Sequence, residues 1–334
     1  MKKVVVVGYD HYGYPNSIAS GFRHIGCEAE LFSHPVVIVS KLKRINPIRR
    51  WILEQRIKRI NADLVAKCES WGAEIVLVIN GEAILRETIK KIKELAKVAV
   101  WIVDSLDHPT VAKDRLDEYD HAFVFEPADV ASLRKASYLP YGADTSAYRK
   151  LNLDFDYDLS FVGRGHGDRL PRLDALAAFC EAKNINFAVF GPFRRFARRF
   201  KRRSAMQDFP ALGRAIKLNG KLKPQQINEI YNRSRINVNM HHHQSKQGLN
   251  PRTFEILASG SLLLTDWKPQ LNHFFEVGEE LAAYKNEDEL FRLVTTLLGD
   301  ERKQARLRAA GYAKVLQSHT FADRCKEIVA RIEW

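Results

Sequence analysis

The sequence predicts an α/β protein with two Rossmann-like halves, each built on a parallel sheet. Its 334 residues suit two domains of roughly 150 residues each. Short runs rich in Val, Ile and Leu alternate with segments of helical periodicity, and most of these runs are continuous rather than alternating. Uninterrupted runs are typical of parallel strands buried on both faces, and the alternation of strands with helices is typical of parallel sheets.

Eight apolar runs mark the expected strands in chain order. They are Val4–Val7, Ile75–Ile79, Val98–Val103, Ala122–Phe125, Leu159–Val162, Phe187–Phe190, Ile236–Val238 and Leu262–Leu264. The spacers between these runs have the length and periodicity of crossover helices, for example Glu87–Leu95 and Leu170–Ala182.

The strand–helix pattern restarts after a polar, Asp-rich stretch, and this restart indicates how the chain divides. We place the join near residues 145–157, so we expect domains at 1–150 and 151–320. We expect the last segment, 321–334, to form a helix that packs back on the first domain.

The net charge of +13 is concentrated in two segments. Residues 41–60 hold eight basic side chains and one acid, and residues 194–203 (RRFARRFKRR) hold seven basic side chains and no acid. Each segment carries +7, so the remaining residues together carry −1. This distribution argues against a general nucleic-acid coat and favours local contact with anions or with a membrane surface.

Cysteine spacing and hydropathy indicate the cellular compartment of the protein. The four cysteines lie far apart without a C-x-x-C pair, so neither a disulfide framework nor a zinc site is expected. No stretch approaches the roughly 20 apolar residues of a membrane span, and the apolar run at the N-terminus is too short for a signal peptide. We expect a cytoplasmic protein, with a possible peripheral position on the inner face of a membrane.

A glycine turn follows the first strand. GYDHYG carries Gly8 and Gly13, which allow a tight turn and a close approach to a ligand at the carboxyl edge of the sheet. The turn is not G-x-G-x-x-G, so NAD is not expected. A plain strand-to-helix turn explains these glycines equally well.

A second glycine turn, FVGRGHGDR, opens the second half. Gly163 and Arg164 follow the strand, and Arg169 stands at the expected helix start. Backbone N–H groups at a helix start, together with two guanidinium groups, suit a diphosphate. The alternative is a surface turn with ordinary arginines.

A polar loop and a helix start make up NMHHHQSKQGLNPRTFE. Asn250 is the expected N-cap with Pro251 after it, and Arg252 and Glu255 lie near one face of the helix. A carboxylate such as Glu255 can accept from the two vicinal hydroxyls of a ribose, or it can be a capping-box acid. The three adjacent histidines predict no metal site, because neighbouring His residues rarely all face one ion.

Several of these segments resemble CgeB-type (spore-maturation-protein-like) glycosyltransferases, which have the GT-B fold. The resemblance rests on RTFEILASGSLLLTD, HFFEVGEELAAYKNEDEL, AAGYAKVLQSHTFADR, DYDLSFVGR, PYGADTSAY and INGEAILRETIKKIKELAKVAVWIVDS. It implies two Rossmann-like domains whose parallel sheets face a cleft, with the acceptor on the first domain and a nucleotide-sugar donor on the second.

The resemblance also implies roles for individual residues. Glu255 matches the acid that binds the donor ribose, and Arg164 and Arg169 match the basic pair that neutralises the donor diphosphate. Gln247 stands eight residues before Glu255, where related retaining enzymes have Glu, so the sugar contact and the retaining outcome are less secure. Gly163, Gln247, Asn250 and Arg252 complete the expected donor site, and Gly8 and Gly13 belong to the acceptor side or to a simple glycine loop.

In the first domain, WIVDSLDHP ends a buried strand with Asp104, Asp107 and His108. GT-B proteins build the acceptor side from such strand ends, so Asp104 or His108 can take or orient the proton of the acceptor hydroxyl. The alternative is capping of the loop before Pro109.

The first basic segment includes an expected amphipathic helix over Pro47–Ala66. Its apolar stripe would be Ile48, Ile52, Leu53, Ile57, Ile60 and Leu64, and its cations are Arg49, Arg50, Arg56, Lys58 and Arg59. The helix either packs on the core with a solvated basic face or docks on anionic lipid headgroups. The second segment, with Phe196 and Phe200 among seven cations, suits an anionic acceptor, a membrane, a nucleic acid or a disordered loop.

We therefore expect a glycosyltransferase of glycan, surface-polysaccharide or glycolipid synthesis, with a carbohydrate or lipid-linked acceptor. No metal or other cofactor is expected, because arginines can neutralise the leaving group. Two alternatives remain: a GT-B protein that binds a nucleotide sugar without transferring it, and, less favoured, a nucleic-acid-binding protein.

Overall fold

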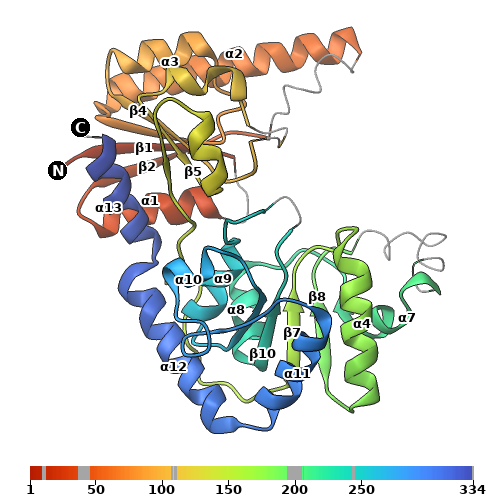
Figure 1. Cartoon of the computed structure of the whole chain (residues 1–334). Coiled ribbons are helices and arrows are strands. Elements are labelled where there is room, and N and C mark those ends of the chain that lie inside the picture. Colours follow the sequence, from red (N-terminus) through yellow and green to blue (C-terminus); the bar gives the residue numbers. More distant parts are fainter. Residues whose placement is uncertain are drawn as a thin grey trace. The chain divides into compact units, whose positions relative to one another are not determined.

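A computed structural model of the chain describes residues 1–9, 13–36, 46–106, 108, 111–193, 205, 207–242 and 245–332. The chain forms two compact units (Figure 1). Unit 1 comprises Met1–Gly142 and Phe321–Trp334, and unit 2 comprises Ala143–Thr320.

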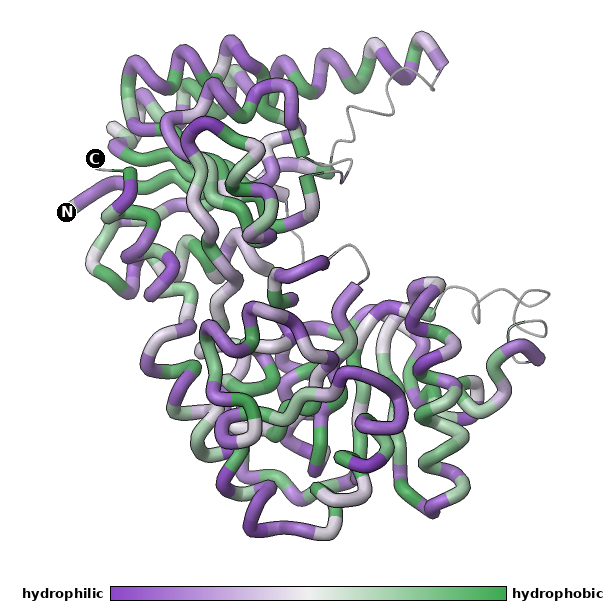
Figure 2. The backbone as a smooth tube through the Cα atoms, viewed as in Figure 1, coloured by the Kyte–Doolittle hydropathy of each residue, from purple (hydrophilic) through white to green (hydrophobic). Residues whose placement is uncertain are grey.

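Unit 1 is built on a six-stranded parallel sheet in the order β2-β1-β3-β4-β5-β6. The strands are β1 (Lys3–Gly8), β2 (Glu28–Ser33), β3 (Ile75–Ile79), β4 (Lys97–Ile102), β5 (His121–Val124) and β6 (Ala136–Tyr138). The helices are α1 (Tyr14–His24), α2 (Pro47–Trp71), α3 (Arg86–Lys93) and α13 (Phe321–Ile332), with 3-10 turns η2 (Lys113–Glu118) and η3 (Pro127–Ser132). The central strands are buried along nearly their whole length, and Figure 2 shows them as the hydrophobic interior of the unit.

Unit 2 repeats this plan with a second six-stranded parallel sheet, in the order β12-β11-β10-β7-β8-β9. The strands are β7 (Tyr157–Val162), β8 (Phe187–Phe190), β9 (Ile216–Leu218), β10 (Ser234–Asn239), β11 (Leu263–Asp266) and β12 (Ala282–Tyr284). The helices are α4 (Arg169–Ala182), α7 (Pro210–Ala215), α8 (Pro224–Asn232), α9 (Pro251–Ala258), α10 (Leu271–Phe274), α11 (Glu287–Leu298) and α12 (Glu301–Ser318).

The eight strands predicted from apolar runs all form, and both sheets are parallel as expected. Four further strands, β2, β6, β9 and β12, lie outside the predicted runs, because β2 is mixed in composition and the other three have only three residues each. All four lie outside the sheet centres; β2, for example, reads EAELFS and buries only one of its six residues. An outer strand has one neighbour or a less buried face, so its composition is mixed and the run-based prediction misses it.

The strand order in each sheet reverses at one point, and ligands of open α/β sheets bind at the carboxyl ends of the strands beside such a point. In unit 2 the reversal lies at β7, between β8 and β10, so the turn after β7 and the loop after β10 share one edge. In unit 1 it lies at β1, between β2 and β3.

The observed division differs in detail from the expected boundaries. Unit 1 ends at Gly142 rather than at residue 150, and the chain re-enters it at Phe321. The returning helix α13 packs on α1: a Cβ built on Gly21 would lie 2.9 Å from the backbone carbonyl of Phe321, so only glycine permits this approach. Among the described residues, none of the helices combines the length and the apolar character needed to span a bilayer.

Candidate functional site

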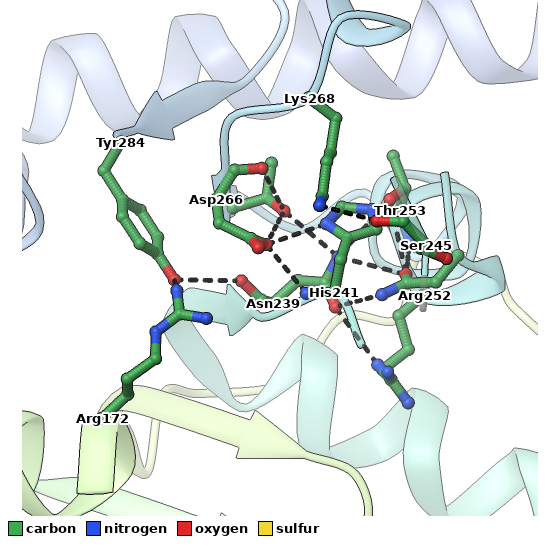
Figure 3. A network of polar contacts seen from close by, with 11 residues as sticks. Arg172, Asn239, His241, Ser245, Arg252, Thr253, Asp266, Lys268 and Tyr284 are labelled. Atoms are coloured by element: carbon green, nitrogen blue, oxygen red, sulfur yellow. Dashed lines mark hydrogen bonds and ion pairs between the residues drawn. The ribbon is translucent and has the colours of Figure 1, made fainter. Parts of the chain in front are cut away.

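The candidate donor site lies at the carboxyl edge of the sheet of unit 2, where a polar network joins four segments of the chain. Figure 3 shows this network running from Arg172 and Tyr284 through Asn239, His241 and Asp266 to Arg252 and Ser245. These side chains come from α4, β12, the end of β10, the end of β11, and the loop and helix that follow β10.

Asn239, the last residue of β10, is fully buried and holds the network together. Its Nδ2 donates to Asn250 Oδ1 at 3.1 Å and to Thr265 Oγ1 at 3.2 Å. Its Oδ1 accepts from Asn250 Nδ2 at 3.0 Å and from Arg252 Nε at 3.2 Å. One buried amide therefore sets the position of the α9 N-terminus and the direction of the Arg252 guanidinium.

Asn250 caps α9 as predicted, because its side chain accepts from the backbone N–H of Thr253 at 3.3 Å and Pro251 follows it. Glu255 lies two residues beyond the capping-box position, which Thr253 occupies. The capping-box interpretation of Glu255 is therefore wrong.

Glu255 lies inside unit 2 with 4% of its surface exposed, in the electrostatic field of Arg252 and of two tyrosines. Burial raises the pKa of Tyr148 and of Tyr231 well above the usual range, and the Glu255 carboxylate raises both further. The Tyr231 hydroxyl is buried without a hydrogen-bond partner among the described residues. The carboxylate proposed to bind a ribose is thus buried close to two phenols, both of which also lie in the electrostatic field of Arg252.

Arg169 begins α4 and is the most buried cation of the site, with 3% of its surface exposed. Burial, and then the charge of Arg252, lower its pKa to about 9. Its Nη1 makes a long hydrogen bond to the Arg164 carbonyl at 3.4 Å, and its Nε has no partner among the described residues. Burying a guanidinium with an unused hydrogen-bond donor lowers the stability of the folded state unless an anion pairs with it.

The glycine turn after β7 lies close to Arg252 of α9. A Cβ built on Gly163 would lie 3.5 Å from Arg252 Nη1 and 2.9 Å from the Phe161 ring. A Cβ on Gly191 would lie 2.1 Å from the Gly163 carbonyl oxygen. Gly163 and Gly191 therefore permit close packing between β7, the loop after β8 and Arg252.

His241 and Asp266 form a buried pair at the ends of β10 and β11. Asp266 Oδ1 accepts from the backbone N–H of His241 and from His241 Nδ1, each at 2.8 Å. Burial would raise the pKa of Asp266, but the contacts with His241 hold it at about 2. Burial lowers the pKa of His241, whose Nδ1 contacts the Asp266 carboxylate and whose Nε2 has no partner among the described residues.

Positive charge exceeds negative charge around this edge of the sheet. Arg169 lies in the field of Arg172 and Arg252, against the carboxylates of Asp168 and Asp266. Lys268 adds a further cation beside His241 and donates from Nζ to the Ser245 carbonyl at 2.7 Å. Arg164, half-buried in the same turn, acts on His166 and helps to lower its pKa to about 4, after burial and Arg169. The surplus of cations can neutralise an anion with more than one charge.

The predicted donor-site residues in unit 2 thus fall into one region, because Gly163, Arg164, Arg169, Asn250, Arg252 and Glu255 all lie at or under this edge. Gln247 is half-buried in the loop between β10 and α9.

Sequence reasoning missed Asn239, Asp266, Arg172, Lys268 and Tyr284. A signal was present for the first two, since each is a polar residue at the carboxyl end of a largely buried strand. Arg172 and Tyr284 carry no such signal, because their contact joins α4 to β12 across more than a hundred residues.

In unit 1, Asp104 follows β4 and is held by Asn80 at the end of β3. Asn80 Nδ2 donates to Asp104 Oδ2 at 2.9 Å, and His108 Nδ1 lies 3.7 Å from the same oxygen. The side chains of Asp104 and His108 are 35% and 37% exposed. The two predicted catalytic candidates are therefore neighbours at the carboxyl edge, accessible to solvent; Asp107 lies outside the described residues.

The glycines of the first turn have structural reasons to be there. A Cβ on Gly8 would lie 3.1 Å from Pro15 Cγ, and Gly13 has a φ of 80° at the N-cap of α1. The residues between them that would face a ligand, 10–12, lie outside the described residues.

The remaining sequence-based expectations have these outcomes. Arg49, Arg50, Arg56, Lys58 and Arg59 are exposed on α2. The helix runs to Trp71, beyond the predicted Ala66. The run 194–203 lies outside the described residues, as does His243 of the triple histidine. Within the described ranges, no three His, Cys, Asp or Glu side chains gather as metal ligands do.

Comparison with known proteins relates this geometry to a family. Residues 172–330 match the family described as glycosyl transferase-like. Among curated protein sequences, none matches this chain.

Solved structures resemble the whole chain. A glycosyltransferase from Rickettsia africae ESF-5 has a TM-score of 0.70 at 12% identity, over 99% of this chain and 98% of that one. Sucrose-phosphate synthase from Thermosynechococcus elongatus has a TM-score of 0.64 at 12% identity, over 99% and 98%. HepE from Anabaena, in complex with UDP and glucose, has a TM-score of 0.63 at 11% identity, over 100% of both chains.

Likeness at such low identity establishes the fold. The predicted GT-B class is confirmed, whereas the CgeB-type assignment stays a prediction. The chain therefore has the GT-B fold, and residues 172–330 match the glycosyl transferase-like family.

Proposed function

We propose that this protein is a glycosyltransferase that moves a sugar from a nucleotide-sugar donor to an acceptor hydroxyl. The observation that carries the proposal is the excess of positive charge at the carboxyl edge of unit 2, with Arg169 buried and its Nε unused. This edge lies at the reversal of strand order, where α/β sheets bind nucleotides.

The chemistry requires these charges in the transition state. The bond between the sugar C1 and the diphosphate oxygen breaks, a bond from C1 to the acceptor oxygen forms, and the acceptor proton passes to a base. Negative charge grows on the departing diphosphate, so guanidinium groups already fixed beside it lower the barrier. Arg164, Arg169 and Arg252 are the candidates for this role, and Glu255 is the candidate for the ribose hydroxyls.

The acceptor side of the proposal rests on unit 1. Asp104, with His108 beside it, is accessible and held by Asn80, as a group that accepts or orients a proton must be. We expect a carbohydrate or lipid-linked acceptor and a role in glycan or surface-polysaccharide synthesis. We also propose retention of the anomeric configuration, which the product's anomeric proton coupling would report.

We propose that the transfer needs no divalent metal, because the arginines supply the neutralising charge. Activity should then be unchanged in excess EDTA, and a loss that Mg²⁺ or Mn²⁺ restores would contradict this part of the proposal.

The test combines binding and turnover. UDP is the first nucleotide to try, because a structural neighbour was solved with UDP and glucose; GDP, ADP, CMP and TDP sugars follow. A bound nucleotide should raise the melting temperature of the wild-type chain. Each arginine–phosphate contact contributes about 1.5–3 kcal/mol, so Arg164→Ala and Arg252→Ala should weaken nucleotide binding about 10- to 100-fold. Glu255→Gln keeps the shape of the side chain and should mainly weaken ribose recognition.

Arg214→Ala is the matched control, because Arg214 lies in the same unit on the surface, paired with Glu181 at 2.7 Å. Binding in the wild type that survives equally in Arg164→Ala, Arg252→Ala and Arg214→Ala would refute the site assignment. Binding without sugar transfer would favour the non-catalytic alternative, which Gln247 at the position of a Glu keeps open. Absence of any nucleotide binding would contradict the proposal as a whole.

A further inference from the structure

Helix α2 carries apolar side chains on two opposite faces, and the core of unit 1 covers only one of them. Ile57, Ile60 and Leu64 are 4%, 7% and 0% exposed and pack against the body of the unit. Ile48, Trp51 and Ile52 are 69%, 61% and 50% exposed. At 3.6 residues per turn the second set lies on the side opposite the first. The single stripe predicted from the sequence is therefore wrong.

The second set begins a surface that we call the outer face of α2: Ile48, Trp51, Ile52, Arg56 and Arg59. Trp51 and Ile52 follow Ile48 by three and four residues, and Arg56 and Arg59 follow Ile52 by four and seven. Two turns with exposed apolar side chains are thus continued by two turns with exposed guanidinium groups. Figure 1 shows this N-terminal part of α2 extending beyond α3.

The charges beside the outer face are mostly positive. Arg49 and Lys58 are exposed on its flanks, and Arg50 is exposed on the other side of the helix. The acids nearby are few: Glu54 pairs with Arg50 at 2.8 Å, and Asp63 lies 3.7 Å from Arg59, whose side chain is 85% exposed. The segment 41–60 as a whole carries +7. An anion-rich surface complements this pattern, and a neutral one does not.

Exposed Trp and Ile beside a row of cations have the arrangement of an interfacial helix. Such a helix places its apolar side chains at the boundary of headgroups and acyl chains, while its basic residues contact headgroup phosphates. Arginine suits this position, because its long apolar stem can follow the buried side chains and its head stays polar. A second copy of the chain would instead place two rows of arginines together, and that arrangement is repulsive.

We propose that the outer face of α2 binds the surface of an anionic lipid bilayer, with Trp51, Ile48 and Ile52 inserted and Arg56, Arg59 and Arg49 on the phosphates. The helix lies in the plane of the surface and does not cross it. This inference does not depend on the proposed enzymatic activity, since lipid binding can be measured without substrate.

The experiment is co-sedimentation of the full chain with vesicles of phosphatidylcholine, with and without about 30% phosphatidylglycerol. The wild type should bind the anionic vesicles, more weakly as salt rises, and should bind the neutral ones poorly. Arg56→Glu/Arg59→Glu should weaken binding by about 30-fold or more, since each basic residue near an anionic surface strengthens binding about fivefold and two are lost. Trp51→Ser should also weaken binding, including at low salt.

The matched control is Lys90→Glu/Lys91→Glu on α3, which makes the same charge change at exposed positions of the same unit. Circular dichroism checks that each variant keeps its helices, and all these positions are exposed. Equal binding by the two charge-reversal variants, or no binding of the wild type to anionic vesicles, would overturn the proposal. A dimer that Trp51→Ser abolishes, without vesicle binding, would overturn it in favour of self-association.

Discussion

At the scale of single residues, two asparagines at strand ends set the positions of the candidate groups. Asn239 in unit 2 directs Arg252, and Asn80 in unit 1 holds Asp104. An amide suits this place because it both donates and accepts, so one side chain can satisfy several neighbours in a buried site. Neither residue was singled out from the sequence, in which each simply ends an apolar run.

Asn80 has a left-handed backbone with a φ of 58°, and its Oδ1 accepts from the Val103 N–H at 2.9 Å. Loss of this side chain leaves a buried donor unsatisfied, so Asn80→Gly should lower the free energy of unfolding by about 1–3 kcal/mol. Asn80→Ala should lower the free energy of unfolding by about 1–2 kcal/mol more than Asn80→Gly, because a Cβ is unfavourable in the left-handed region.

Urea denaturation of the two variants measures this difference. Lys91→Ala and Lys91→Gly provide the control pair, because in the right-handed helix α3 glycine should be the worse residue by about 1 kcal/mol. If alanine is at least as stable as glycine at position 80, the left-handed conformation is not what this site demands.

Two histidines of unit 2 predict a loss of stability in acid. Burial lowers the pKa of His241, and burial with Arg169 lowers that of His166 to about 4. In the unfolded chain both take up a proton near pH 6.5, so below about this pH the unfolded state binds more protons than the folded state. Stability should therefore fall as the pH falls from 6.5, and the contribution of His166 should level off near pH 4.

Melting temperatures between about pH 7.5 and about pH 4.5 test this expectation. The melting temperature of His166→Asn should fall less steeply with falling pH than that of the wild type. The melting temperature of His24→Asn, which changes an exposed position of α1, should fall as the wild type does. If the melting temperature of His166→Asn depends on pH as steeply as that of the wild type, then His166 has the same pKa in the folded and unfolded chain, and the expectation is wrong.

At the scale of elements, the buried strands could be predicted and the outer strands could not. A strand with a helix layer on each side is mostly apolar, and β3 and β8, which are apolar throughout, match their predicted bounds at both ends. Strand β2 reads as polar and apolar in mixture because fewer neighbours cover it.

Helix α2 shows a second limit of prediction from apolar periodicity. Its apolar residues could be counted from the sequence, but their division between a core face and an outer face depends on where α3 and the sheet end. The result changes the interpretation of the basic segment: its arginines accompany exposed apolar side chains rather than a solvated back of a core helix.

At the scale of the whole molecule, the last helix belongs to the first unit. Phe321, Cys325, Ile328 and Ile332 of α13 are at most 4% exposed, and the Arg324 Nε donates to the Tyr141 carbonyl at 3.1 Å. The segment 140–142, which ends the first part of unit 1, is thereby tied to a helix from the C-terminal part of the chain.

The stability of unit 1 should therefore depend on α13. Ile328→Ala removes a fully buried side chain and should cost about 2–5 kcal/mol. Lys326→Ala, at an exposed position of the same helix, should change stability by less than about 0.5 kcal/mol.

Hydrogen exchange distinguishes the two units in this experiment. Amides of β1 and β3 should lose protection in Ile328→Ala, and those of β7 and β10 should keep it. Equal loss in both units would mean that they unfold together, and no loss in unit 1 would mean that α13 contributes little to it.

The sequence by itself determined the class of the protein, the restart of the pattern and the place of most candidate donor residues. These features are local: strands buried on both faces are mostly apolar, and a few adjacent residues determine each helix cap and each glycine turn. Only the tertiary structure decided which polar groups meet. Asp266 reaches His241, Arg172 reaches Tyr284 and α13 returns to α1 across long stretches of chain, because the parallel sheets bring distant strand ends to a common edge. The difference between the two apolar faces of α2 has the same origin, because the fold places neighbouring side chains against one face and leaves the other exposed.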